Sequence, residues 1–439
     1  MNPELQRNLW LEAGPFRLFL IAGLLLLVFA ASAASRLTTP ANAALALYWF
    51  FAVLWGTRSA ALSVVAEIRE RTWDSQKLSS IAPWTMMWGK LLGATSANWF
   101  GALLCLPFVL WPAWREGAIV SAVIYGVILL ALGLFAQSVA LLSSLMLIRR
   151  QTGNWRLDTF LCQVAGIGAA LAYYSLWSSV GAFARSGTQS ITWWGRDFSL
   201  GGFHLVSLLL FLGWALTGCW RAMRAELRLA NGPFVWLAYL LYLGLYNAGF
   251  ESEIVRRAPV LLQAGPVVMR LALAALVPLL SCYGMAFLEP KDPVRLRWLG
   301  ERLRAGHLRQ AFLALDAWML SYGASAILGL LLAAALAVQG LSAPAFQVLA
   351  MLGFLTRDLA IFVLMRTMAG GKGDFAALAV IGALYLLVPV ILDGIGAPAL
   401  AAFFLPADGS PLVPVAAWVQ GIGVALWAAR RIGAPFTPR

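Results

Sequence analysis

Long apolar runs separated by short polar segments dominate this chain. Most runs are about 20 residues or longer, the length that an α-helix needs to cross some 30 Å of hydrocarbon. We find no segments of about 10 residues that alternate apolar and polar positions, as the strands of a membrane β-barrel do. We therefore predict an all-α polytopic membrane protein with about twelve membrane-spanning helices, at residues 16–35, 42–66, 91–113, 117–147, 158–180, 201–220, 233–250, 260–288, 313–338, 345–366, 376–394 and 412–429.

The first run, 16–35, ends in small residues that resemble a signal-peptide cleavage site. Its core is long enough to span a membrane, and residues 2–12 have the pattern of an amphipathic surface helix rather than of a short basic leader. Leu5 and Leu9 share one face of that helix. We therefore expect the first run to be an uncleaved span.

Composition supports the membrane assignment. Of 439 residues, 61% are hydrophobic and 12% are charged, whereas a soluble domain carries roughly 25% charged residues. So few charged residues leave too little polar surface to keep a chain of this length in water.

The net charge of +13 follows the predicted topology. With the N-terminus and the C-terminus in the cytoplasm, 23 of the 32 Lys and Arg residues fall in cytoplasmic segments and six fall outside. Such a bias in short loops is the positive-inside pattern, and it holds basic residues against the anionic cytoplasmic leaflet. The bilayer therefore explains the charge, and no nucleic-acid partner is predicted.

The four cysteines and two histidines give no sign of a metal site. The cysteines lie in apolar runs at unrelated spacings, and no Cys/His cluster has metal-ligand spacing. A membrane-embedded enzyme would also need converging His, Asp or Ser side chains. We therefore predict no metal, no disulfide framework and no catalytic residues in this chain.

The loop at 67–90, between the second and third spans, is too polar for a membrane and too structured for a linker. Thr72 can cap the start of a helix there. Leu78 and Ile81 can rest against the membrane protein, and Pro83 ends the segment. We predict a short helix on the cytoplasmic face with both ends anchored in spans, so that a partner pressing on it would move two spans at once.

This loop resembles the coupling segment of the type-2 ABC (ATP-binding cassette) exporter permeases. That pattern runs roughly E-x-x-x-G-T-[LW]-[DE], then a helix, then G-K-[LI]. Two departures affect the local backbone: Arg71 stands where the family has Gly, and Ser79-Ser80 stand where it has Thr-Pro. The matching positions in this chain are Glu67, Thr72, Trp73, Asp74, Gly89, Lys90 and Leu91.

The resemblance covers about residues 1–230. Within that range, Asn2-Pro3-Glu4-Leu5 is similar to the start of the family's connecting helix, and residues 221–227 (RAMRAEL) are similar to the exit of its sixth span. The resemblance therefore implies a six-span permease domain at 1–230 with a coupling loop at 67–90. Residues 231–439 then form a second six-span membrane region, which the sequence allows to be a degenerate permease half.

The resemblance also implies a function and partners. The chain would be the permease subunit of an exporter in the cytoplasmic membrane of a bacterium, and a separate ABC ATPase subunit on its cytoplasmic face would bind ATP and Mg²⁺. Neither Gly89-Lys90 nor Gly371-Lys372 has the spacing of a phosphate-binding loop, so no cofactor is expected in this chain. A second permease subunit and a self-dimer both stay open. The loop residues expected to reach the ATPase are Glu67, Arg69, Glu70, Asp74 and Lys77.

The two ends of the chain match weakly at an offset of about 299. Residues 295–310 then correspond to 2–12, and the spans at 16–35 and 42–66 map onto 315–334 and 341–365. Thr57-Arg58 falls on Thr356-Arg357. A degenerate repeat near 295–394 and the general similarity of leucine-rich helices explain the match equally well.

Three arginines, Arg58, Arg270 and Arg357, fall within predicted spans. A basic residue at a helix centre costs about 2.5–3.5 kcal/mol on insertion scales, and such residues are candidates for function. Snorkelling to the interface and pairing with a carboxylate such as Asp358 are the competing explanations, and the sequence favours them. The Trp193-Trp194 pair can be an interfacial anchor or part of an outer exit region.

An ion-coupled secondary transporter is the alternative function, since twelve spans and internal repeats fit it too. It would need intramembrane carboxylates for coupling to protons or sodium. Only Asp316, Asp358 and Asp393 approach membrane depth, and Asp316 and Asp393 lie near span ends.

Overall fold

The computed structural model describes residues 2–34, 38–78, 81–148, 155–184, 190–252, 254, 265–369, 373–406 and 409–433, without the side chains of 148, 155 and 176–184. Ser79, Ser80, Gly371 and Lys372 lie outside the described residues. The chain divides into two compact units. The first comprises Met1–Ile191 and Phe198–Asn231, and the second comprises Thr192–Asp197 and Gly232–Arg439.

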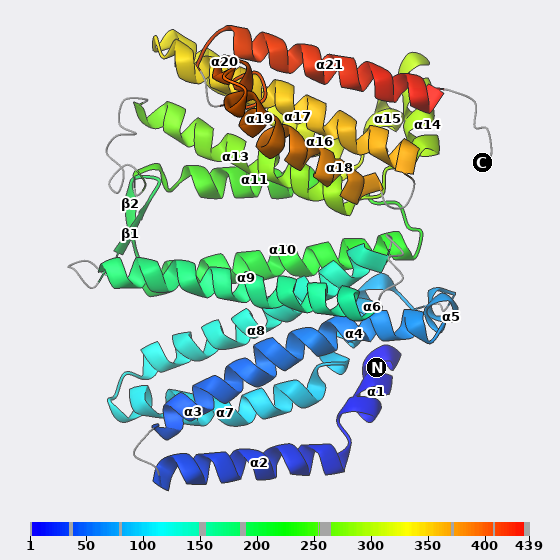
Figure 1. Ribbon diagram of the computed structural model, residues 1–439. Helices are drawn as coiled ribbons and strands as arrows, with labels where there is room; N and C mark the ends of the chain where they lie inside the picture. The colour runs from blue at the N-terminus through cyan, green and yellow to red at the C-terminus, as the bar shows by residue number, and fades with distance from the viewer. Residues whose placement is uncertain are drawn as a thin grey trace. The chain divides into compact units, whose positions relative to one another are not determined.

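The first unit is a bundle of helices in which α8 packs on α4, α9 and α10, and α3 packs on α7 (Figure 1). Its main core is formed by apolar side chains of α4, α5, α6, α8 and α10. In order along the chain, its helices are α1 (Pro3–Glu12), α2 (Pro15–Ala34), α3 (Pro40–Tyr48), the π-helix η1 (Trp49–Trp55), α4 (Gly56–Arg69), α5 (Trp73–Lys77), α6 (Pro83–Trp88), the π-helix η2 (Gly89–Gly93), α7 (Ser96–Arg115), α8 (Ile119–Ile148), α9 (Trp155–Ala184) and α10 (Leu200–Glu226). The strands β1 (Ser190–Trp193) and β2 (Arg196–Ser199) lie between α9 and α10 in the sequence, and each is divided between the two units.

The second unit is organised around α17, which packs on α16, α18 and α21, while α13 packs on α11 and α16. Gly421 lets α21 approach α17 closely, because a Cβ there would stand 2.8 Å from the carbonyl oxygen of Gly353. The elements are α11 (Phe234–Ala248), α13 (Gly265–Leu288), α14 (Pro293–Arg304), α15 (Leu308–Leu313), α16 (Ala317–Val338), α17 (Ser342–Ala369), α18 (Gly373–Gly382), the π-helix η5 (Ala383–Leu387), α19 (Val388–Gly394), α20 (Pro398–Ala401) and α21 (Leu412–Gly433).

Ten helices in the described part of the chain are long and apolar enough to cross a membrane. The protein is therefore an all-α polytopic membrane protein, apart from the short β1–β2 hairpin, which the sequence did not predict. The remaining two predicted spans coincide with α9 and α11. Since the 15 residues of α11 extend only about 22 Å, the number twelve stays a prediction, as does the cytoplasmic position of the termini.

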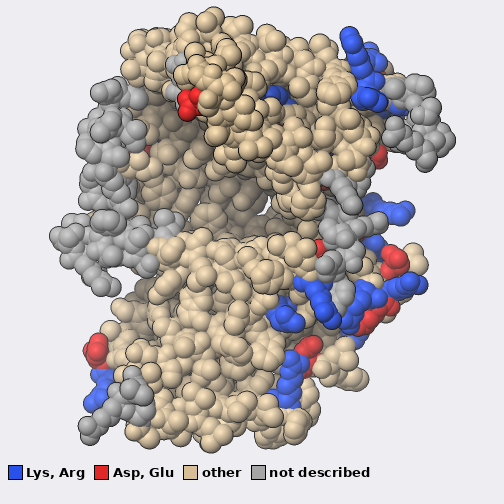
Figure 2. All heavy atoms as spheres, viewed as in Figure 1, with Lys and Arg blue, Asp and Glu red and all other residues tan. Residues whose placement is uncertain are grey.

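Charged side chains gather mainly at one end of the helices in each unit (Figure 2). In the first unit this end carries α1, α5 and α6, and in the second it carries α14 and α15. Ion pairs join many of these groups, among them Arg7–Glu67, Lys77–Glu226 and Arg295–Asp316. The long apolar flanks of the helices carry few charges, as expected of surfaces that face lipid.

The N-terminal surface helix is present, but its buried face is the polar one. Asn2 caps α1 by accepting hydrogen bonds from the backbone N–H groups of Glu4 and Leu5, each at 3.1 Å. Glu4 and Asn8 are its buried residues, whereas Leu9 is exposed. In a membrane protein an apolar face can point to lipid while a polar face packs on other protein groups.

Candidate functional site

The predicted coupling loop lies over a buried lysine. Lys90, in η2, has no exposed surface. Its ammonium forms an ion pair with Glu67 at the end of α4 and lies 3.3 Å from Glu4 of α1. It also donates to the side-chain oxygen of Gln76 in α5 at 3.1 Å and to the Ser63 carbonyl oxygen at 3.3 Å. One buried cation therefore connects α1, α4, α5 and η2.

The surrounding charges balance this cation. Arg7 of α1 pairs with both Glu4 and Glu67, at 2.9 Å in the first case, so two carboxylates face two cations. Gln76 donates to Glu67 at 2.7 Å. A buried charge is tolerated only when it is paired and hydrogen-bonded, and each group of this cluster meets that condition. We call Glu4, Arg7, Glu67, Gln76 and Lys90 the Lys90 cluster.

Two glycines of η2 let α1 reach the cluster. A Cβ on Gly89 or on Gly93 would stand 2.6 Å from the Cβ atom of Glu4 or of Asn8, respectively. Asn8 donates to the Gly89 carbonyl oxygen at 3.2 Å. The glycine of the Gly89-Lys90 pair therefore permits a close contact between helices.

Trp73 anchors the loop in the protein core. It is 3% exposed and packs in the core of the first unit, where the core side chains include Met86, Met87 and Met223. Its ring also lies 5.0 Å from the Lys90 ammonium, in cation–π geometry. This side chain therefore fixes α5 to the helices beneath it.

The opposite side of the loop is open to solvent. Arg69, Glu70 and Asp74 have side chains that are 50%, 58% and 89% exposed. Lys77 is partly exposed and bridges Asp74, at 3.4 Å, and Glu226 at the end of α10, at 3.7 Å. Of the residues predicted to reach a partner, these four can do so, whereas Glu67 is committed to the Lys90 cluster.

Several local predictions for the loop were wrong. The helix α5 has five residues, and Thr72 stands at its N-cap position as predicted, but the Thr72 hydroxyl makes no capping hydrogen bond and instead donates to the Glu67 carbonyl oxygen at 3.2 Å. Leu78 is 89% exposed instead of packed, while Ile81 does pack on the core. Pro83 begins α6 rather than ending a helix, since a proline is favoured in a first helical turn.

Arg71 has a left-handed backbone conformation, with φ of 59°. This is the position where the resembled family has glycine, which adopts positive φ without steric penalty. The chain thus keeps a backbone turn that suits glycine while carrying a side chain that disfavours it.

Arg357 lies in a buried polar cluster of the second unit, which we call the Asp358 cluster. Its Nε atom donates to Asp358 at 3.0 Å, its Nη1 atom donates to Gln420 of α21 at 2.9 Å, and its Nη2 atom has no partner in the described part of the chain. Asp358 also accepts from the hydroxyls of Tyr283 in α13 and Tyr385 in η5, at 2.8 and 2.9 Å. The cluster pins α13, α17, η5 and α21 together.

The other two intramembrane arginines differ from Arg357. Arg270 pairs with Glu251 at 3.3 Å and lies 5.2 Å from the ring of Trp194. Arg58 is exposed on α4, and its guanidinium meets no partner among the described residues. Pairing with a carboxylate therefore explains how Arg270 and Arg357 are stabilised within their predicted spans, but it does not explain Arg58.

The Trp193-Trp194 pair is held on the end of α11. The indole of Trp193 donates to the Tyr246 carbonyl oxygen at 3.0 Å, and that of Trp194 donates to the Leu245 carbonyl oxygen at 3.3 Å. Both rings are therefore fixed by hydrogen bonds at this helix end, and their role as an interfacial anchor stays a prediction.

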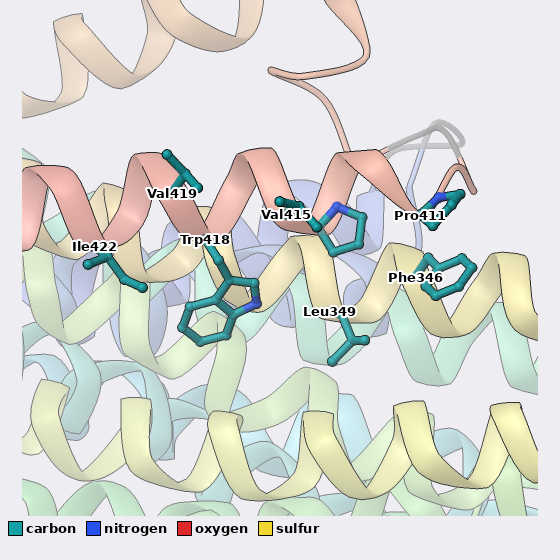
Figure 3. A pocket seen from close by; sticks show the side chains of 8 residues that line it. Phe346, Leu349, Pro411, Val415, Trp418, Val419 and Ile422 are labelled. Atoms are coloured by element: carbon teal, nitrogen blue, oxygen red, sulfur yellow. The ribbon is translucent and has the colours of Figure 1, made fainter.

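An apolar pocket of about 470 Å³ lies along α17 and α21 (Figure 3). Its lining offers contacts for a hydrocarbon chain but brings no charged groups together. The lining residues are Phe346, Leu349, Pro411, Pro414, Val415, Trp418, Val419 and Ile422.

Sequence reasoning missed two partners of the Lys90 cluster, Arg7 and Gln76, and the tyrosines around Asp358. The sequence predicted α1 as a surface helix, but only the likeness of Asn2-Pro3-Glu4-Leu5 to a connecting helix linked it to the coupling loop. Comparisons with protein-family models, with curated proteins and with solved structures find no match.

Proposed function

We propose that this chain is the membrane-spanning permease subunit of an ATP-driven exporter of the type-2 ABC kind. The observation that supports the proposal best is the Lys90 cluster. A single buried ammonium connects the loop helix α5 to α1, to the end of α4 and to η2, which leads into α7. A push on α5 is therefore transmitted to two candidate spans and to the surface helix.

The docking surface for the ATPase subunit is the open side of the loop, at Arg69, Glu70, Asp74 and Lys77. Their exposure leaves them available to a partner, and charged groups at such a surface set register and specificity more than raw affinity. In this proposal the partner binds ATP and Mg²⁺ and carries out hydrolysis, while this chain holds no cofactor and transmits the movement.

The second unit then acts as a second membrane half of the exporter. The loop at its corresponding position, near residues 366–375, is short and lacks the Thr-Trp-Asp sequence, so the proposal gives the ATPase contact to the first unit. The complex would lie in the cytoplasmic membrane of a bacterium with both termini of this chain in the cytoplasm.

Purification of the full chain in mild detergent after chemical cross-linking tests this function. We expect an ABC ATPase subunit in the purified complex. The double variant E70K/D74K should release that subunit, or uncouple its ATP hydrolysis from export in proteoliposomes. The amount of folded permease should stay unchanged, because surface substitutions usually alter stability by under about 0.5 kcal/mol.

The matched control is E116K/D393K. It makes the same two reversals at exposed positions near the predicted outer ends of α7 and α19, and it should keep the ATPase. Recovery of no ATPase with the wild-type chain would remove the permease proposal.

The second candidate function is ion-coupled secondary transport. The observation in its favour is Asp358, a carboxylate with no exposed surface deep in α17. Its carboxylate accepts from Tyr283, Arg357 and Tyr385 at 2.8–3.0 Å, and this arrangement fits a fixed ion pair with Arg357. Uptake driven by an imposed proton or sodium gradient, and its loss in D358N, would favour this candidate.

A further inference from the structure

Arg58 lies deep in a candidate span. It stands eleven residues before the end of α4 at Arg69, which corresponds to about 16 Å along the helix axis. Snorkelling covers only part of such a distance, and the side chain is exposed rather than folded into the unit. A cation at this depth requires a partner that stabilises it.

The equivalent arginine of the second unit has its partner within the chain. At the offset that pairs Thr57-Arg58 with Thr356-Arg357, the next residue is Ser59 in the first unit and Asp358 in the second. Asp358 pairs with Arg357 at 3.0 Å, whereas Ser59 accepts a hydrogen bond from Asn98 at 2.8 Å. The first unit thus keeps the cation and lacks the adjacent anion.

A second copy of the chain does not offer the missing anion. Within the described parts of the ten candidate spans and α9, Asp358 is the only carboxylate more than three residues from a helix end, and Arg357 and two tyrosines occupy it. Among the described residues of these helices, no carboxylate is therefore left for Arg58 at this depth, and a separate molecule can supply the anion.

Apolar groups lie beside Arg58 on the same helix. Trp55 stands one turn before it and Leu54 four residues before it, both exposed, and residues three or four apart share a helix face. Phe50 packs edge to face on Trp55 with ring centroids 5.4 Å apart. A cation at one end of an exposed aromatic surface matches a molecule with an anionic head and a hydrocarbon body.

We propose that Arg58 binds the anionic group of an amphiphile, a carboxylate or a phosphate monoester, with its apolar part on Phe50, Leu54 and Trp55. The guanidinium fork matches the oxygens of either group. This inference rests on the proposed export function when it assigns the substrate class, since it makes the exported molecule an anionic amphiphile. The binding site itself requires no ATPase.

Three pyrene-labelled probes with the same hydrocarbon chain test the site on the full protein in nanodiscs of zwitterionic lipid. One probe carries a carboxylate, one a phosphate monoester and one a neutral hydroxyl, and binding is followed by energy transfer from tryptophan. We expect an anionic probe to bind at least about tenfold more tightly than the hydroxyl probe, a difference of about 1.4 kcal/mol. Comparison of the two anionic probes identifies the preferred head group.

Arg58→Gln should abolish the preference for anionic probes, and Arg58→Lys, which keeps the charge, should retain most of it. The matched control is Arg115→Gln, which removes the same charge from an exposed arginine at the end of α7 and should leave the preference intact. No preference in the wild-type chain, or an equal preference in Arg58→Gln, overturns the proposal. A loss of dimer in native mass spectra of Arg58→Gln without a change in probe binding also overturns it, in favour of a protein interface.

The probe experiment and the ATPase purification fail independently. If no ATPase is recovered but Arg58→Gln loses anion binding, the site stands and the export function falls. If the ATPase is recovered and Arg58→Gln binds like wild type, export stands and the anionic substrate class falls.

Discussion

Lys90 and Glu67, separated by 23 residues in the sequence, form an ion pair in which the ammonium has no exposed surface. The contact joins the first residue of the predicted coupling loop to its last residue. The loop is therefore closed at its base by a buried charge pair, and the hydrogen bond from Lys90 to Gln76 ties α5 to it.

Substitution of Lys90 by Met should destabilise the first unit by about 3 kcal/mol, because it leaves the buried carboxylates of Glu4 and Glu67 with Arg7 alone. Unfolding in mixed micelles, followed by tryptophan fluorescence, measures the loss. Arg69→Met is the control, since Arg69 and its partner Glu70 have side chains that are 50% and 58% exposed, and it should lose under about 1 kcal/mol. Equal losses in the two variants would contradict a special role for the buried pair.

Gly93→Ala should displace α1. The added Cβ would stand 2.6 Å from the Cβ of Asn8, and overpacking of this kind costs roughly 1–3 kcal/mol. We expect faster proteolysis between α1 and α2 in the folded protein. Gly23→Ala is the control, because nothing lies within 4 Å of a Cβ there, and protection unchanged from wild type in both variants would show that α1 does not depend on this contact.

Arg71→Gly should stabilise the first unit by about 0.5–1 kcal/mol. Removing a side chain from a left-handed conformation relieves backbone strain of roughly 1–2 kcal/mol. The greater conformational entropy of glycine in the unfolded chain offsets about half of this gain. Arg69→Gly removes the same charge from the last turn of α4 and should instead lose about 1 kcal/mol. The midpoints of thermal unfolding should therefore shift in opposite directions, and a shared direction would refute the strain at Arg71.

The Asp358 cluster should respond non-additively. Arg357→Gln and Asp358→Asn should each cost about 3–5 kcal/mol, because each leaves an uncompensated buried charge. The double variant should be more stable than the sum of the two losses predicts, with a coupling of about 0.5–3 kcal/mol. Additive losses in the same unfolding assay would show that the two side chains act separately. Arg270→Gln, at a partly exposed pair, should cost less than either single change.

The topology has a direct chemical check. Single cysteines placed at Asp74 and Arg304 should be shielded from an impermeant thiol reagent added to intact cells, and cysteines at Glu116 and Gln339 should react. All four positions are exposed, and the four native cysteines are buried, so the background should be low. Labelling of Asp74 and Arg304 from outside would reverse the orientation that the basic residues predict.

The sequence determined the class of the protein and much of its helix pattern. Each apolar run carries its own signal, because the length of a helix and its transfer into hydrocarbon depend on local composition. The ranges 201–220 and 412–429 accordingly fall within α10 and α21. The loop at 67–90 was also recognisable as structured, since its polar, aromatic and proline residues are local features too.

The turn geometry within that loop was harder to predict. Thr72 was a reasonable helix cap by residue type, yet its hydroxyl donates to the Glu67 carbonyl oxygen in the structure. Pro83 could equally end one helix or begin the next, and only the path of the backbone decides between these outcomes.

Only the tertiary structure decided which polar groups meet. Glu4 and Lys90 stand 86 residues apart, and Tyr283 and Asp358 stand 75 apart, so no local pattern connects them. The same holds for Arg58 and Arg357, which have similar local sequences but different surroundings. Away from water, an arginine is stabilised by whichever anion the packed helices bring to it. Which anion meets the arginine depends on how helices that are distant in the sequence pack together. The spans themselves depend only on contiguous apolar residues.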